Sequence, residues 1–236
     1  MAVDRKGAGY LRDSPYLVGD VEKYKHELSL LLEGSKIRKY RASEAIFRKG
    51  EVGDRFYFIK RGKVQVTMSG PDGAEKIVAI QEANTFSNDT CLDGYPSVAT
   101  GVALEDSEIY EIEKAHFESC VKRCPTVALM VLESVIRKAR TVAFQVGYLS
   151  LFKARGRVAH LLLVLAHEIG TETQEGIVLQ RSLTHETLAG LTGLARPTLT
   201  SVLNDLERSK MIKTRNHRVT IIDRQGLAGA AENIHA

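Results

Sequence analysis

Hydrophobic and polar residues follow three successive patterns along this chain of 236 residues. Up to about residue 35, a polar lead is followed by a short helix-like stretch that ends in Leu-Leu-Leu-Glu-Gly at 30–34, where Gly34 is a typical helix stop. From there to about Lys114, short apolar runs are separated by glycines. After Pro125 the apolar residues recur at helical spacing. The chain therefore predicts an α+β protein with an N-terminal sheet domain and a helical C-terminal part.

The glycine-punctuated part of the chain predicts a small antiparallel β-barrel. Apolar residues alternate with polar ones from Val64 to Met68, and a second run follows the turn sequence Ser-Gly-Pro-Asp-Gly at 69–73, so these two runs predict a hairpin. Many short strands at regular spacing favour a closed or rolled, jelly-roll-like sheet. We assign residues 1–124 to this sensor domain and its N-terminal helix. The expected strands lie at 56–59, 64–68, 77–80, 98–104 and 108–112.

A long dimerisation helix is predicted over residues 125–152. Its apolar positions alternate in steps of four and three, which is the spacing of a coiled-coil seam. Leu129, Ile136 and Ala143 form a second apolar stripe, which we expect to face the barrel while the seam faces a second copy of the chain. A helix packed only on its own barrel is the alternative. The seam consists of Ala128, Leu132, Val135, Ala139, Val142, Val146 and Leu149.

Residues 153–236 predict a winged helix-turn-helix domain, and the segment 185–203 carries its spacing. Ala189, at the fifth position, is small enough for two crossing helices to approach closely, and Gly193 at the ninth takes the positive φ of the turn. Pro197 suits the first turn of the second helix, whereas Ala195 is a weak N-cap. The small core of the motif is expected from Leu188, Leu194, Leu199 and Val202. Upstream we expect a hinge at 153–156, a helix at 157–167 and a loop at 168–176.

The second helix of this motif and the segment after it offer DNA-binding chemistry. Arg196 can read guanine through two hydrogen bonds, and Thr184 caps the first helix where a phosphate contact would fall. Two strands about a turn near Asn216 predict a wing, and the segment 208–224 holds six Lys or Arg residues against one acidic residue. The expected DNA contacts are Thr184, Arg196, Thr198, Thr200, Ser201, Asn204, Lys213, Arg215 and Arg218.

Composition limits the function further. The net charge of +4 is only mildly basic, and three cysteines cannot form a disulfide framework. The start of the chain is polar without a secretory pattern, and no apolar run is long enough to span a bilayer, so we expect a cytoplasmic protein with no membrane partner. No nucleophile–base pair, metal-ligand spacing or phosphate loop is found in the sequence, so an enzyme is not expected.

From about residue 30 to residue 226 the chain resembles the Crp–Fnr family of bacterial regulators. The resemblance rests on Gly-Glu-Val-Gly-Asp at 50–54, Tyr-Phe-Ile at 57–59, Gly-Lys-Val at 62–64, Gly-Arg-Val-Ala at 156–159 and, most specifically, the helix-turn-helix. It implies a homodimer on double-stranded DNA with two-fold symmetric half-sites about 34 Å apart. It also implies contact with RNA polymerase, for which the loop at 168–176 is a candidate.

The sequence departs from the cyclic-nucleotide members of that family. They carry a Gly-Glu pair for the ribose and an Arg-Ser pair for the phosphate, where this chain has Phe-Ser-Asn-Asp-Thr at 86–90 and Pro-Ser-Val-Ala at 96–99. Asp89 can stand in for the Glu, but no Arg is present to neutralise a phosphate. Val142 and Ala143 replace the hydroxyl residues that meet the adenine, so cyclic AMP is not the expected effector.

We expect instead a small effector of other chemistry in an apolar pocket that also includes Tyr148. It is a neutral, apolar or aromatic molecule, or a small carboxylic acid held by Asn88 or Gln145. The expected effector site consists of Phe86, Asn88, Asp89, Thr90, Cys91, Ser97, Val98, Val142, Ala143, Gln145 and Val146.

Other readings remain open. A redox-responsive regulator would use Cys91 as its switch without a ligand, while Cys120 and Cys124 are interpreted as packing thiols. A haem-type gas sensor would need His116 or Cys91 as axial ligand, but neither has a diagnostic neighbourhood; the N-terminus lacks the cysteine cluster of the iron–sulfur members. A sensor that binds a protein through its helix-turn-helix is the non-DNA alternative. The reading helix keeps only Arg196 of the two arginines frequent in the family, so Arg196 is expected to carry most guanine recognition.

Overall fold

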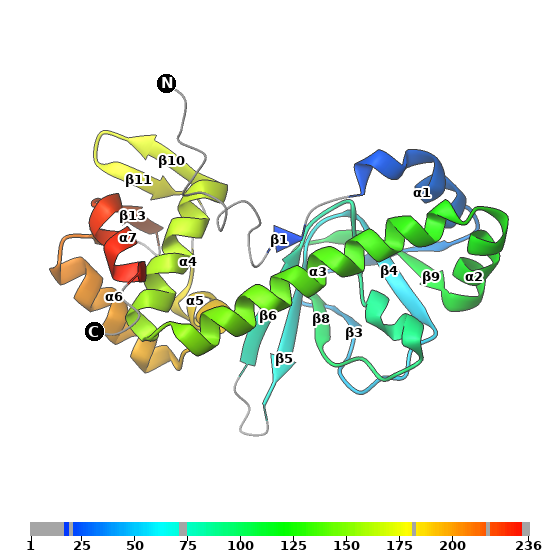
Figure 1. Ribbon diagram of the computed structural model, residues 1–236, viewed down its shortest axis with the longest axis horizontal. Helices are drawn as coiled ribbons and strands as arrows, with labels where there is room; N and C mark the ends of the chain where they lie inside the picture. The colour runs from blue at the N-terminus through cyan, green and yellow to red at the C-terminus, as the bar shows by residue number, and fades with distance from the viewer. Residues whose placement is uncertain (1–16, 19–20, 71–74, 181–182, 216–217, 233–236) are drawn as a thin grey trace. The chain divides into compact units, whose positions relative to one another are not determined.

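The computed structural model of the chain describes residues 17–18, 21–70, 75–180, 183–215 and 218–232. The chain divides into two compact units, built largely from residues 15–143 and 144–236. Helix α3 (Thr126–Leu151) contains the boundary between Ala143 and Phe144 and so contributes residues to both units. Figure 1 shows the order of the elements along the chain.

Two sheets form the core of the N-terminal unit. Their strand orders are β1-β6-β5-β8-β3 and β2-β9-β4-β7. The pairs β2–β9, β4–β9, β4–β7, β3–β8 and β5–β8 are antiparallel, and β1 pairs with β6 in parallel. The predicted jelly-roll-like fold is confirmed, but the sheets are separate and do not close into one barrel. The strands are β1 (Leu17–Val18), β2 (Lys36–Tyr40), β3 (Ala45–Phe47), β4 (Arg55–Arg61), β5 (Val64–Ser69), β6 (Glu75–Gln81), β7 (Thr85–Ser87), β8 (Thr100–Ala103) and β9 (Ser107–Glu113).

All five expected strand regions are found, as β4, β5, β6, β8 and β9. The turn proposed at 71–73 lies outside the described residues. β2 was not predicted because four of its five residues are exposed, and β3 and β7 have only three residues each. The helical segments of this unit are η1 (Glu22–Tyr24), α1 (Lys25–Leu32), η2 (Asp89–Asp93) and α2 (Lys114–Arg123), and Figure 1 shows α1 and α2 side by side.

Helix α3 packs on this unit with a different face from the one predicted. Val127, Met130 and Val131 are buried in a cluster with the rings of Phe56 and Phe86. The prediction that Leu129, Ile136 and Ala143 face the barrel is therefore wrong: all three are exposed. The buried face continues through Ser134 to Lys138, whose polar groups have partners in the N-terminal unit. A search for purely apolar stripes misses a face that ends in serine and lysine.

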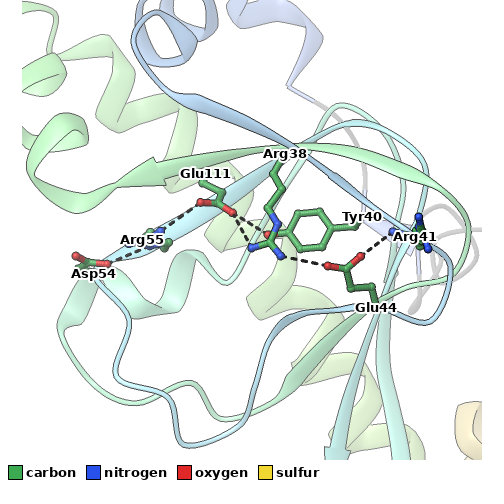
Figure 2. A network of polar contacts seen from close by, with 7 residues as sticks. All are labelled: Arg38, Tyr40, Arg41, Glu44, Asp54, Arg55 and Glu111. Carbon is green, nitrogen blue, oxygen red and sulfur yellow. Dashed lines mark hydrogen bonds and ion pairs between the residues drawn. The ribbon is translucent and has the colours of Figure 1, made fainter.

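A buried carboxylate, that of Glu111, organises one end of the sheet β2-β9-β4 (Figure 2). It accepts a hydrogen bond of 2.9 Å from the Tyr40 hydroxyl and pairs with Arg55 at 3.2 Å and Arg38 at 3.8 Å. Arg55 also contacts Asp54. A buried charge is tolerated only when it is paired and hydrogen-bonded, so this network allows a carboxylate inside the sandwich. Burial and the nearby Glu111 raise the pKa of the Tyr57 hydroxyl to about 12, which keeps that phenol neutral.

The C-terminal unit packs helices on a small sheet of order β10-β11-β13-β12. Its helices α5 and α6 pack on α4, and α7 packs on α4 as well (Figure 1). The helices are α4 (Ala154–Ile169), α5 (His185–Thr192), α6 (Arg196–Arg208) and α7 (Arg224–Glu232). The strands are β10 (Gly170–Thr173), β11 (Gly176–Leu179), β12 (Ile212–Arg215) and β13 (Arg218–Ile221).

Two expectations for this unit are corrected. The segment 168–176 is not a loop, because α4 runs to Ile169 and β10 pairs with β11 in a hairpin. The expected hinge at 153–156 covers fewer residues than predicted, because Lys153 is the N-cap of α4 and residues 154–156 are already helical.

An aromatic cluster lies beside the break between α3 and α4. The rings of Phe144, Tyr148 and Phe152 surround His160, and burial lowers the pKa of His160.

Candidate DNA interface and effector cassette

Helices α5 and α6 form the helix-turn-helix that the spacing predicts. The Thr184 hydroxyl accepts a hydrogen bond of 3.1 Å from the N–H of Thr187, which caps α5. Gly193 ends α5 with φ of +66°, a conformation that glycine adopts without steric cost. Ala195 precedes α6 without a side-chain cap, and Pro197 lies in its first turn, as expected. Leu188, Ala189 and Leu199 are buried between the two helices and the rest of the unit, while Leu194 and Val202 are half-buried.

The outer face of α6 presents most of the expected DNA-reading residues. Arg196, Thr198, Ser201 and Asn204 are all exposed. Thr200, which was expected on this face, is half-buried, and its hydroxyl lies 3.0 Å from Nδ1 of His185 and donates to the carbonyl of Arg196. Its hydroxyl therefore connects α6 to α5, and the other four expected residues of α6 are open to solvent.

The wing is a strand pair with basic residues. β12 and β13 pair antiparallel, with Arg215 directly opposite Arg218, and both side chains are exposed. The turn near Asn216 lies outside the described residues. Lys213 is half-buried, and its ammonium is 3.3 Å from the carboxylate of Glu175, at the turn of the β10–β11 hairpin. Arg215 and Arg218 are thus the wing residues with charge available to a phosphate backbone.

The cassette, residues 86–99, joins β7 through η2 to the start of β8. Asn88 has a left-handed backbone with φ of +55°, and its side-chain oxygen accepts a hydrogen bond of 2.6 Å from the Ser97 hydroxyl. Backbone hydrogen bonds from Gly50 to Ser97 and from Ser97 to Glu51 hold the cassette against the neighbouring loop. The side chains of Asn88 and Ser97 are therefore paired with each other.

Sequence reasoning missed Lys138, which contacts the cassette from α3. Its ammonium lies 2.6 Å from the carboxylate of Asp89, which is almost fully buried, and 2.8 Å from the carbonyl of Phe86. Ser134 donates to the same carboxylate at 3.2 Å. The available signal was position: Val127, Val131, Ser134 and Lys138 recur in steps of four, three and four on one helix face.

The apolar residues expected to line one effector pocket differ in burial and are divided between the two units. Phe86 is fully buried in the ring cluster with Phe56 and Phe58, whereas Val98 is 61% exposed and Val142 54% exposed. Tyr148 belongs to the aromatic cluster of the C-terminal unit. Of the remaining expected residues, Asp89, Cys91, Ser97 and Gln145 are buried, Asn88 is half-buried, and Thr90, Ala143 and Val146 are exposed.

The predicted dimer seam divides into two groups. Leu132, Ala139, Val142 and Val146 are exposed, whereas Val135 packs partly on the core of the N-terminal unit, and Ala128 and Leu149 are half-buried. Together with Leu129 and Ile136, the exposed members make an apolar strip along α3. Exposed apolar strips of this kind mark surfaces that associate with another protein surface.

Cys91 and His116 were the alternative sensor residues. Cys91 is buried, its thiol donates to the carbonyl of Arg55, and burial with the nearby Asp89 and Asp93 raises the pKa of the thiol to about 11. The Nε2 atom of His116 is 3.0 Å from the carbonyl of Leu31. A reactive thiolate is therefore disfavoured at Cys91. The Nε2 atom of His116, a candidate haem ligand, already has the carbonyl of Leu31 as its partner.

Each of the two units matches a known protein domain. Residues 37–124 match the cyclic nucleotide-binding domain, and residues 156–230 match the Crp-like helix-turn-helix domain. Among curated proteins, the chain is 28% identical over 187 residues to a CRP-like cAMP-activated global transcriptional regulator of Mycobacterium tuberculosis, covering 79% of this chain and 84% of that protein. It is 26% identical over 193 residues to the global nitrogen regulator of a Nostoc species, covering 78% and 84%.

Solved structures share the fold. The c-di-GMP responsive global regulator CLP of Xanthomonas campestris matches with a TM-score of 0.76 at 17% identity, covering 83% of this chain and 97% of that one. The names of these three proteins refer to cAMP, nitrogen and c-di-GMP, so the fold alone does not specify an effector.

A sandwich domain of the cyclic nucleotide-binding type followed by a winged helix-turn-helix defines a DNA-binding transcription regulator rather than an enzyme. The chain belongs to the Crp–Fnr family of these regulators. In the part of the chain that the structure describes, no helix has the length and apolar character needed to cross a membrane.

Proposed function

We propose that the protein acts as a homodimer on two-fold symmetric DNA, with one α6 helix reading each half-site. The observation that carries the proposal is the exposed group Arg196, Thr198, Ser201 and Asn204 on one face of α6. Arg offers the bidentate donor geometry that matches guanine, and the hydroxyl and amide side chains suit other base edges or phosphates. Arg215 and Arg218 of the wing supply backbone contacts that do not depend on sequence.

Dimer formation is proposed through α3. Leu132, Ile136 and Val142 are 51%, 43% and 54% exposed on this helix, and Ala139 is exposed between them. Apolar side chains at this spacing are buried when two helices pair along a seam. A two-fold symmetric dimer presents two identical reading helices, which accounts for a two-fold symmetric operator. We also propose contact with RNA polymerase, for which the segment 168–176 was the candidate surface of this chain.

A small effector other than cyclic AMP is proposed to act at the cassette. The Ser87 hydroxyl, in the first part of the cassette, is fully buried and has no hydrogen-bond partner among the described residues. An unpaired buried hydroxyl costs about 1–3 kcal/mol, so a ligand that offers it a hydrogen bond would be favoured. Ser87 lies opposite Tyr57 in the β4–β7 pairing, and the Tyr57 phenol is neutral. A neutral ligand with a hydrogen-bonding group suits this position better than a phosphate.

A redox switch at Cys91 is the alternative. It requires a thiolate, and the raised pKa of Cys91 keeps the thiol protonated at neutral pH.

The DNA proposal is tested by selecting duplexes from a random pool with the purified full-length protein and measuring binding of the selected sequence against salt. We expect an inverted repeat and a steep fall in affinity with rising salt. Failure to enrich any sequence, with salt-independent binding, would count against DNA recognition and in favour of a protein partner.

The effector proposal is tested by native mass spectrometry of the purified protein, together with thermal shifts on a panel of cyclic nucleotides and neutral aromatic compounds. We expect stabilisation by a neutral compound that is lost in Ser87→Ala. Stabilisation by cyclic AMP that persists in Ser87→Ala would overturn this part of the proposal.

A further inference from the structure

A buried ion pair joins the cassette to helix α3. The ammonium of Lys138 lies 2.6 Å from Oδ2 of Asp89, with side-chain exposures of 17% and 2%. The same ammonium donates to the carbonyl of Phe86 at 2.8 Å, and Ser134 donates to the same carboxylate oxygen at 3.2 Å. Three hydrogen bonds therefore connect one face of α3 to two positions of the cassette.

The pair fixes position more than it adds stability. Removing two charges from water costs free energy that their attraction only partly returns, so a buried pair is weak evidence for stability, and fixing a unique arrangement is its best-attested use. Ser134 and Lys138 are one helical turn apart, so only one rotation and one height of α3 bring both onto the same oxygen. The left-handed backbone of Asn88 directs the chain into η2, in which Asp89 is the first residue.

The pair also decides which charge the cassette can accept. An anion bound at the cassette would need a cation, and Lys138, the cation of α3 that contacts the cassette, is already matched by Asp89. An added anion that took Lys138 would leave the Asp89 carboxylate buried without its counter-charge, which is strongly unfavourable. The buried Ser97 hydroxyl of the cassette already donates to Asn88.

We propose that the Asp89–Lys138 pair is a latch, in which the chain's own carboxylate replaces an anionic effector and holds α3 on the cassette. With the latch closed, α3 is docked on the N-terminal unit without any added ligand, and an effector acts at the cassette only as a neutral molecule. One step rests on the proposed function: because α3 continues into the C-terminal unit, its docking sets the DNA affinity of the dimer.

The test is hydrogen–deuterium exchange on the full-length protein without ligand. Asp89→Asn and Lys138→Met each remove one charge, and the double variant removes both. The matched control is Glu133→Gln, on the same helix: Glu133 pairs with Lys23 at a similar 2.7 Å but in a more exposed position, with side-chain exposures of 35% and 58%. The glutamine keeps an oxygen that can accept the hydrogen bond of the Tyr24 hydroxyl, so this change removes the charge alone. Exposed pairs contribute little, so the control should change exchange by less than twofold.

We expect exchange in residues 126–143 and 86–93 to rise at least tenfold in Asp89→Asn and in Lys138→Met. The double variant should exchange no faster than the faster single variant, because both changes break one interaction. Exchange in either single variant within twofold of the Glu133→Gln control would overturn the latch, and so would effects that multiply in the double variant. If a single variant does not fold, the double variant decides alone: unchanged exchange relative to wild type overturns the proposal, and faster exchange supports it.

DNA binding is measured separately on the same variants with the duplex selected by the wild type. We expect Asp89→Asn to weaken binding at least tenfold, while added acetate, phosphate or cyclic AMP leaves the wild type unchanged. Faster exchange in the variants of a protein that binds no DNA would support the latch and reject the proposed function. Normal DNA affinity in a variant with faster exchange would overturn the step that links α3 to DNA binding.

Discussion

Nδ1 of His185 in α5 lies 3.0 Å from the hydroxyl of Thr200 in α6, which joins the two helices of the DNA-binding motif. The single proton of that hydroxyl goes to the carbonyl of Arg196, so the hydroxyl oxygen accepts and the ring nitrogen donates. The contact holds α6 against α5, while Arg196, Thr198, Ser201 and Asn204, the residues proposed to face DNA, are exposed.

Replacing Thr200 with valine should therefore weaken DNA binding without changing which bases are preferred. The loss of one hydrogen bond between the helices costs about 1 kcal/mol of folding free energy. Urea unfolding and duplex selection on Thr200→Val measure the two effects separately. A changed base preference at any half-site position would show that Thr200 reads DNA directly.

Arg196→Ala should reduce specific binding by about 1–3 kcal/mol and relax the base preference at one position of each half-site. The reason is that Arg196 is the one exposed guanidinium in the first turn of α6. Arg208→Ala, at the other end of α6 where Arg208 pairs with Asp205, is the matched control. An unchanged preference in Arg196→Ala would mean that α6 is not the reading helix.

The wing residues Arg215 and Arg218 should contribute equally to the binding of all DNA sequences. Arg215→Ala or Arg218→Ala is expected to weaken selected and random duplexes alike and to reduce the salt slope by about 1. Lys213→Ala should do less, because Lys213 already pairs with Glu175. Titrations at several salt concentrations measure the slope, and a loss confined to the selected duplex would assign these residues to base reading instead.

Cys91 should react slowly with alkylating reagents in the folded protein. Its pKa is raised to about 11, so the reactive thiolate is scarce at neutral pH and becomes abundant only as the pH approaches that value. Iodoacetamide labelling at pH 7 and pH 9, followed by mass spectrometry, should show Cys91 at least tenfold slower than in urea-unfolded protein. Equal labelling rates of Cys91 in folded and unfolded protein would support the alternative in which Cys91 is a redox switch.

Local spacing carried enough information to predict the DNA-binding motif and the main strands. The motif depends on contacts between residues close in sequence, such as the Thr184 cap and the Gly193 turn, so its pattern is visible without the fold. The half-buried position of Thr200 was not visible, because its exposure depends on how His185 lies across from it. The segment 168–176 was read as a loop because it is largely polar, and three of the four residues of β10 are exposed.

The cassette shows where local spacing fails. Which face of α3 is buried depends on its rotation, and neighbouring positions on a helix differ by 100°. The apolar residues at 129, 136 and 143 suggested one rotation, while the contacts of Ser134 and Lys138 with Asp89 select another. Asp89 is 49 residues from Lys138 in the sequence, so the residues around Asp89 and those around Lys138 give no local pattern that predicts the ion pair.

The most direct test of the account is the stoichiometry of the protein on DNA, measured by sedimentation velocity with the selected duplex and with a single half-site. We expect a free dimer, two chains on each symmetric duplex, and conversion to a weakly binding monomer in Leu132→Glu, because the exposed strip on α3 is then interrupted by a charge. A wild-type monomer that binds one chain per duplex and has no preference for inverted repeats would contradict it.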